Sequence, residues 1–507
     1  MTLTRVEVDG IPALFAERTD GVYSGGILFR VGWADENLAV RGLTHLVQHL
    51  VLHDLVGDVH RHSEVTATYT HVHTRGGSPE QVARMLNGLC EALRDPPVGR
   101  LEVTKEALRA EERGPDGAGR VAALLRYGAH DHGLAAFPEV GLPEIGPGLV
   151  QVWVGEAFTT GNAMLWFTGD RMPENLQLTL PEGSRQPVPA ASKPRANTPA
   201  WSVVDGSDLV HVTAVVPPSP AAAIFADVLN GALHHDLRER DAVSYSAGAT
   251  YTVRDPASAV IAVTADCLPE QRGAVIGGVV DTLARLRWGA VSADELTEIT
   301  SAAATAVDEQ SEDVDTIVPR AVSSLLGLTF PEPHRLAAEY RAVTAADVQR
   351  VAEAFHRSAI AQVPEVGLGW AGWHAAHLGS GEVVDGVALT GRDGHHERLV
   401  VGDRGVSVTT ADAVSTVLYD DVAVLESFAD GGRHLVGTDG VQVHLEPTLW
   451  EVDDAALARV DGAVDLARVV RHPARNPDDL PLPPEPVDEE DGESAGSRSR
   501  WRRLTGR

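Results

Sequence analysis

The sequence predicts an α+β fold with two related halves and a smaller β-rich region near the C-terminus. Three observations predict it. Strands of alternating hydrophobicity are followed by pairs of amphipathic helices, the same order returns in the second half, and short strands with glycine turns fill residues 375–470. At 507 residues the chain is long enough for two to four domains.

The two halves share one order of elements. Residues 89–112 and 279–307 each read as a helix, a short break and a second helix opened by an acidic residue, with Glu102-Val-Thr matching Glu295-Leu-Thr. An alternating strand precedes each pair, at 65–75 and at 258–267. We therefore expect two sheets, each covered by helices, in an N-terminal lobe (1–182) and a C-terminal lobe (201–368).

Composition marks the remaining segments. Residues 183–200 are rich in Pro, Ala and Ser and predict a linker. Residues 398–447 alternate apolar and polar positions between Asp-Arg-Gly, Asp-Gly-Gly and Thr-Asp-Gly turns, and one helix follows, which predicts a small domain over 375–470 of roughly pleckstrin-homology shape. Residues 473–507 are Pro-rich, then acidic, then basic, and we expect a disordered tail.

Charge and cysteine content limit the functional classes. The net charge of −30 argues against nonspecific binding to nucleic acid or to an anionic membrane. No apolar run reaches the roughly 18 residues of a membrane span, and the first 21 residues alternate like a strand rather than a signal peptide. Cys90 and Cys267 have apolar neighbours and predict buried free thiols. We expect a cytoplasmic protein.

Two histidines stand four residues apart in the run RGLTHLVQHLVLHDL. Residues 42–56 predict a helix with a broad apolar face, on which His45 and His49 point the same way, one turn apart. Two imidazoles at this spacing can hold one zinc ion with a third ligand from elsewhere. A lone pair at this spacing also occurs by coincidence on helix surfaces, so the spacing alone leaves both interpretations open.

The surrounding residues resemble a known zinc motif. GLTHLVQHLVLH is similar to the inverted motif His-x-x-Glu-His, preceded by Gly-Leu, of the pitrilysin/insulinase family of zinc peptidases, which includes mitochondrial processing peptidase. Gly42, Leu43, His45 and His49 match, and Gln48 stands where the family has glutamate.

The resemblance also implies a third zinc ligand and a peptide site. A downstream glutamate completes the zinc shell in the family, and in VTKEALRAEERG the first choice is Glu111, the second Glu112 and the third Glu106. In the second half, LRERDAVSY is similar to the family's C-terminal signature, which implies that Arg238 and Tyr245 hold the peptide backbone. The family's two lobes close like a clamshell around an unfolded peptide.

Gln48 changes the expected chemistry. A glutamine amide has nearly the size of a carboxylate but cannot accept a proton, and the loss of a general base costs about 10²–10⁴ in rate. Three explanations stay open: a natural pseudo-peptidase that binds peptide without cutting it, a deliberate replacement of the base, or another carboxylate, such as Glu64 or Glu112, that reaches the water.

Three functions follow from these alternatives. The first is a catalytically impaired, zinc-binding homologue that works beside an active partner subunit or as a homodimer. The second is an active metalloendopeptidase that uses another carboxylate. The third is a non-catalytic interaction protein that acts through its C-terminal β domain.

Overall fold

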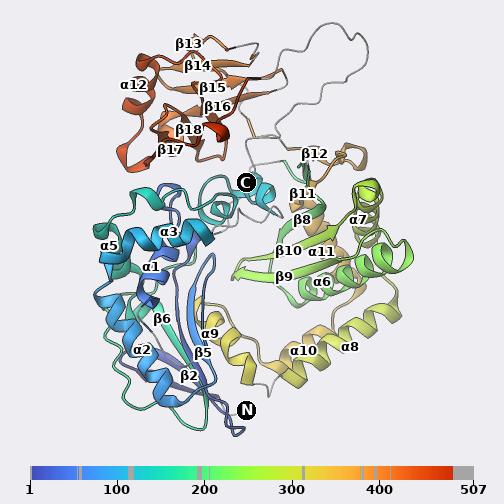
Figure 1. Ribbon diagram of the computed structural model, residues 1–507. Coiled ribbons are helices and arrows are strands. Elements are labelled where there is room, and N and C mark those ends of the chain that lie inside the picture. The colour runs from blue at the N-terminus through green and yellow to red at the C-terminus, as the bar shows by residue number, and fades with distance from the viewer. Residues whose placement is uncertain are drawn as a thin grey trace.

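The computed structural model describes residues 3–53, 55, 60–111, 119–190, 197–204, 206–289, 291–310, 314–376, 378–379, 382–392, 395, 397–411 and 413–483. Within these ranges the chain forms two helix-covered sheets, which face each other, and a separate β-rich body beside the first of them (Figure 1). The α+β fold with two related lobes is thus confirmed.

The N-terminal lobe has a six-stranded sheet in the order β1-β2-β6-β3-β5-β4. Its strands are β1 (Leu3–Val8), β2 (Ile11–Glu17), β3 (Ser24–Phe29), β4 (His60–Val65), β5 (Thr70–Arg75) and β6 (Ala163–Gly169). The helices that share its main core are α1 (Leu43–Leu52), α2 (Pro79–Arg94), α3 (Leu101–Glu111) and α5 (Pro147–Ala157). Alternate strand residues such as Ile27 and Phe29 point into this core, as the period of a strand requires.

The C-terminal lobe repeats this arrangement in the order β12-β7-β11-β8-β10-β9. Its strands are β7 (Ala200–Val203), β8 (Leu209–Val216), β9 (Ala247–Asp255), β10 (Ser258–Asp266), β11 (Ile360–Val363) and β12 (His374–Ala375). The core helices are α6 (Pro220–Leu233), α7 (Arg272–Arg287), α8 (Ala293–Gln310) and α11 (Ala345–Ser358). In each lobe a parallel pair, β2 with β6 or β7 with β11, is followed along the sheet by three antiparallel pairs, which confirms the predicted repeat.

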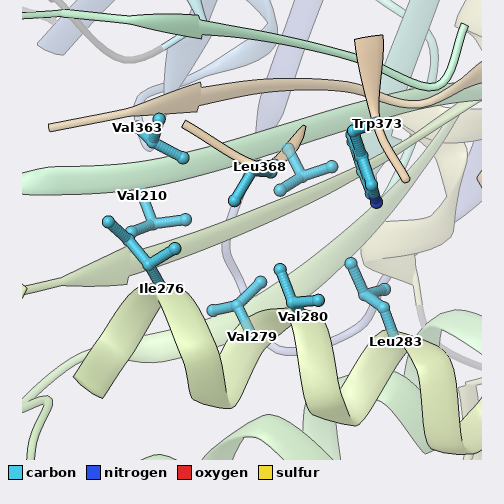
Figure 2. Close-up of a pocket in the computed structure, with 9 residues that line it drawn as sticks. Val210, Ile276, Val279, Val280, Leu283, Val363, Leu368 and Trp373 are labelled. Atoms are coloured by element: carbon cyan, nitrogen blue, oxygen red, sulfur yellow. The ribbon is translucent and has the colours of Figure 1, made fainter. Parts of the chain in front are cut away.

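The packing of α7 against its sheet is entirely apolar. Figure 2 shows Ile276 of α7 below Val210 of the sheet and Leu283 of α7 below Trp373. The hollow between them has no room for a bound molecule and offers no polar lining atoms. It is therefore part of the core and not a binding site.

Each lobe contributes one helix to the other. α9 (Ile317–Leu325), from the second half, packs Ile317, Ala321 and Leu325 on the face of the first sheet opposite its main core. α4 (Arg120–Tyr127), from the first half, packs against β11 of the second sheet. α10 (Pro333–Arg341) runs beside α8 as the chain returns from α9 (Figure 1). The lobes are therefore joined by exchanged helices as well as by the chain between them.

The β-rich body, called the C-terminal module here, spans residues 386–472. One sheet has β13 (Gly386–Leu389), β14 (Arg398–Gly402), β15 (Gly405–Thr409) and β16 (Val414–Leu418). The other has β17 (Val422–Phe428), β18 (Arg433–Gly437), β19 (Gln442–Leu445) and β20 (Val469–His472), with α12 (Asp454–Ala463) before β20. Val424, Val436 and Val470 pack the module onto the N-terminal lobe beside Leu38 and Leu134.

The structure corrects three expected boundaries. Residues 65–75 are the end of β4, a turn and β5, because the Thr66 side chain and backbone bind Tyr69 and close a hairpin. The helix expected over 42–56 ends at Leu52. The tail was expected from residue 473, but the structure describes the chain up to residue 483, and Arg475 within this part binds Asp430 and Glu446 of the module; residues 484–507 lie outside the described part.

Three further expectations concern the cysteines, membrane-spanning helices and the linker. Cys90 and Cys267 are buried free cysteines, as predicted. Within the described residues, no helix combines the length and the apolarity that a membrane crossing needs. The segment expected as a linker is partly attached to the lobes, since Arg185 donates hydrogen bonds to the carbonyls of Gly161 and Leu325.

Candidate metal centre

The helix that carries the two histidines is anchored by a buried carboxylate. Glu36 accepts hydrogen bonds from the backbone N–H groups of Gly42 (2.9 Å) and Thr44 (2.7 Å) at the start of α1. A carboxylate there satisfies free N–H groups and complements the positive end of the helix dipole. Leu46 and Leu50 are fully buried in the lobe's core. These contacts at its start and on its inner face fix α1, so the direction of its outward side chains is fixed too.

His45 and His49 lie one turn apart on the outward side of α1, as the spacing predicts. Their ring centroids are 4.7 Å apart, and their side chains are 28% and 32% exposed. Glu111, the last residue of α3, places its Oε2 atom 3.4 Å from His49 Nε2. The ligand atoms of all three residues lie within 4.8 Å of one another, and this is the one such group of metal-binding type among the described residues.

The three residues open into one cavity of about 460 Å³. Among the described residues its lining consists of Trp33, Arg41, His45, Gln48, His49, Ser63, Glu64, Val65, Glu111 and Glu139. Gln48 therefore faces the same space as the two imidazoles and the Glu111 carboxylate. Of the other glutamates considered from the sequence, Glu106 is exposed on α3 outside this lining, and Glu112 lies outside the described residues.

This donor set fits zinc. Two imidazole nitrogens and one carboxylate oxygen are a common three-residue zinc shell, and a fourth position is left for a small molecule. Burial and the neighbouring His45 lower the pKa of His49, which favours the neutral imidazole that a metal requires. Burial opposes the charged form of His45 as well, but the hydrogen bond and charge of Glu139 outweigh it and raise the pKa of His45. A metal ion bound at this centre would therefore compete with protons.

Glu139 is a member of the site that the sequence did not reveal. Its Oε1 atom lies 2.9 Å from His45 Nδ1 and 4.0 Å from Arg41 Nη1. Burial raises the pKa of this carboxyl, but His45 and Arg41 outweigh it and lower the pKa below its usual range. Glu139 lies 94 residues from His45 in the chain, so no motif or helical spacing could have joined them.

A third carboxylate, that of Glu64, reaches the cavity from the sheet. Glu64 on β4 lies directly across from His71 on β5, with its Oε1 atom 3.5 Å from His71 Nδ1. The indole N–H of Trp166 donates to the other ring nitrogen of His71, at 3.0 Å. The hydrogen bond with His71 lowers the pKa of Glu64, so its carboxylate is ionised at neutral pH.

The structure does not bring Arg238 and Tyr245 to this cavity. Neither residue is among the described lining residues. The Arg238 guanidinium instead lies 5.3 Å from the centre of the Tyr245 ring, in the C-terminal lobe, and the Tyr245 side chain is 79% exposed. The two residues thus contact each other and are open to solvent.

No family model matches the sequence, and no curated protein is significantly similar to it. Solved structures do share its fold. A protease from Helicobacter pylori superposes with a TM-score of 0.61 at 14% identity, and 72% of this chain covers 100% of that one. A peptidase M16 inactive domain from Pseudomonas fluorescens gives 0.57 at 14% identity, with 72% of this chain and 99% of that chain covered.

Pitrilysin gives a TM-score of 0.55 at 13% identity, with 72% of this chain and 45% of pitrilysin covered. The shared portion is thus less than half of pitrilysin but nearly all of the two other chains. Sequence identities of 13–14% to these structures show that the architecture is shared. The chain has the fold of the M16 peptidases, with a cavity lined in part by His45 and His49 in its N-terminal lobe and a further β module.

Proposed function

We propose that this chain is a zinc-binding homologue of the insulinase-type (M16) peptidases that holds an extended peptide and cleaves it poorly or not at all. One observation carries the proposal. His45, His49 and Glu111 converge in one cavity with Gln48, and Gln48 occupies the motif position of the family's base. The cavity thus has the residues for a metal but lacks the usual proton acceptor.

A zinc ion in this cavity would act as a Lewis acid toward a peptide carbonyl and would acidify a water molecule. The Gln48 amide can hydrogen-bond to water or to a peptide through its oxygen or its NH₂ group. It cannot take up a proton at physiological pH. The residues of this chain therefore support binding and polarisation better than they support proton transfer.

An edge strand beside the cavity supports peptide binding. β4 is the last strand in the order of the first sheet, and its residues Ser63, Glu64 and Val65 line the cavity. An edge strand offers unpaired backbone N–H and C=O groups, to which an extended peptide can add as a further strand. A peptide paired there would lie next to His45 and His49. Arg238 and Tyr245, which lie outside the described lining of this cavity, would hold a part of the peptide that extends beyond it.

The catalytic half of the proposal is tested by restoring the base. A quenched-fluorescence peptide library is incubated with the zinc-loaded wild-type protein, with Gln48→Glu and with Gln151→Glu, a matched control on the exposed surface of α5. We expect Gln48→Glu to raise the cleavage rate by about 10²–10⁴ and Gln151→Glu to leave it unchanged. The gain should vanish when His45→Ala is added. Rapid cleavage by the wild-type protein, or no gain with Gln48→Glu, would refute an impaired centre.

An active enzyme that uses Glu64 as its base is the alternative. The position of Glu64 on the cavity wall and its contact with His71 favour it. Its lowered pKa opposes it, because a general base works best with a pKa near the working pH. The two functions are separated by Glu64→Gln in the otherwise wild-type chain. Loss of a measurable wild-type activity in that variant would favour the alternative.

We further propose that an active peptidase subunit works beside this chain, or that two copies pair. An impaired centre that still binds peptide has a use when a second centre performs the cleavage. Size-exclusion chromatography with light scattering tests the homodimer, and co-purification from the native source tests the second subunit. A strictly monomeric protein that purifies alone from its native source would contradict this part.

A further inference from the structure

Glu139 reaches the cavity through a segment that lies unusually close to the start of α1. Gly42, at φ +103°, precedes α1, and a Cβ atom on it would lie 2.9 Å from the Cβ atom of Glu139. A Cβ atom on Gly141 would lie 2.5 Å from the backbone nitrogen of Arg41. Only glycine at both positions lets the two backbones approach this closely without a shift. The approach sets the Glu139 carboxylate beside the first histidine of the motif.

The carboxylate is held from two directions. Its side chain is 14% exposed and lies between His45 Nδ1 at 2.9 Å and Arg41 Nη1 at 4.0 Å. Arg41 is itself fixed by Glu36, at 3.2 Å from Nη1. A half-buried carboxylate with two such partners has little freedom to turn away. Its position is therefore a property of the folded chain rather than of a bound metal.

The segment that carries Glu139 is also fixed from outside. Leu134, Ala136 and Phe137 are buried against Val424 and Val436 of the C-terminal module. Lys105 Nζ donates a hydrogen bond to the carbonyl of Pro143, on the other side of Glu139. Residues on both sides of Glu139 are thus packed, which gives the carboxylate a rigid support.

The direction of the hydrogen bond determines which ring nitrogen remains for a metal. An ionised carboxylate only accepts, so the hydrogen between Glu139 and His45 belongs to Nδ1. The lone pair of a neutral His45 ring then lies on Nε2. Carboxylates that fix a metal-binding histidine in this way usually contribute 10–100-fold in metal affinity, as an order of magnitude.

We propose that Glu139 is a positioning residue of the metal centre, which holds His45 with its hydrogen on Nδ1 and so presents Nε2 as the ligand atom. The proposal rests on the proposed function, since it assigns a metal to the same cavity. The proposal concerns a different residue from those of the proposed function, because Glu139 lies outside the His-x-x-x-His motif and outside the ligand group formed with Glu111. Beside Glu111, which would bind the metal, the chain therefore has Glu139, which orients the ligand His45 and does not itself bind the metal.

The test has two readouts on the full-length protein. The first is the ¹³Cδ2 chemical shift of labelled histidines in the metal-free protein near pH 8, which reports the tautomer; His45→Gln assigns the His45 signal. The second is the dissociation constant for zinc, measured by competition with a chelating dye. The variants are Glu139→Gln, Glu139→Ala and the control Glu106→Gln, which removes an exposed carboxylate from α3.

We expect His45 to be the Nδ1–H tautomer in the wild type and in Glu106→Gln, and a mixture in Glu139→Ala. Zinc affinity should fall about 10–100-fold in Glu139→Ala, less in the isosteric Glu139→Gln, and not in Glu106→Gln. Equal zinc affinity in all four proteins, or an Nε2–H tautomer in the wild type, overturns the proposal while the zinc site stands. A wild-type protein that binds no zinc defeats the proposed function and with it the metal centre. An Nδ1–H tautomer in that protein that becomes a mixture in Glu139→Ala would then show only that Glu139 orients His45.

Discussion

At the scale of single residues, the site divides into a part that local spacing predicts and a part that it cannot. His45, Gln48 and His49 share one side of a helix because their spacing matches the helical turn, and the sequence was enough to find them. Glu111 followed from the resemblance to a family motif. Glu139 comes from a segment with no regular period, and its placement depends on backbone approach at two glycines. The contact between Glu139 and His45 therefore depends on the tertiary structure and cannot be predicted from local spacing.

A buried histidine next to the site makes the stability of the fold depend on pH. His132 is 3% exposed and lies against the rings of Trp33 and Tyr127. Burial, with help from the nearby positive charge of Arg254, lowers the pKa of His132 to about 4. Between pH 6.5 and about 4 the unfolded chain binds a proton that the folded chain does not. The stability that comes from neutral His132 is therefore complete above pH 6.5 and is lost as the pH falls.

We expect His132→Phe to reduce the slope of the unfolding free energy against pH by about 1.4 kcal/mol per pH unit in this window. Urea unfolding at several pH values between 7 and 4.5 measures it, with His374→Gln, an exposed imidazole on β12, as the control. Equal slopes for His132→Phe and the wild type would show that His132 binds a proton in the folded protein as readily as in the unfolded chain.

At the scale of elements, the period of hydrophobic residues predicted which helices and strands form, but not always which element each of them packs against. The paired helices α2–α3 and α7–α8 were expected from their repeat, and the turns of the C-terminal module from their glycines. The exchange of α4 and α9 between the lobes was not expected, because an apolar helix face does not reveal which sheet it will pack against. The strand expected over 65–75 failed for another reason. Its alternation continues through the Thr66–Tyr69 turn, so only the hydrogen bonds reveal the hairpin.

The exchanged helix α9 should contribute substantially to the stability of the first sheet. Leu325 is 1% exposed and packs in one cluster with Leu28 and Trp166 of that sheet. We expect Leu325→Ala to cost about 2–5 kcal/mol, the range for a buried leucine whose removal leaves a cavity. Urea unfolding followed by tryptophan fluorescence measures it. The control Leu466→Ala, whose side chain is 71% exposed, should cost less than about 0.5 kcal/mol. Equal effects would mean that α9 does not pack on this sheet in solution.

At the scale of the whole molecule, buried contacts between the parts position the centre. Arg126 of α4 is 2% exposed and donates to the carbonyls of Thr213 (2.9 Å) and Ser358 (2.8 Å) in the other lobe. Burial lowers the pKa of Arg126 to about 10, so it still carries its charge at neutral pH. The C-terminal module packs on the residues before α1 and on the segment that leads to Glu139. It therefore supports the cavity wall in addition to any role in binding a partner.

The central claim is that one metal ion is held by His45, His49 and Glu111 in a chain that lacks the usual base. The most direct measurement is the zinc content of the purified full-length protein, by inductively coupled plasma mass spectrometry after growth with zinc and removal of loosely bound metal. The account predicts about one zinc per chain in the wild type and in Gln48→Glu, and close to none in His45→Ala or His49→Ala. A metal-free wild-type protein, or an unchanged zinc content in His45→Ala, would contradict it.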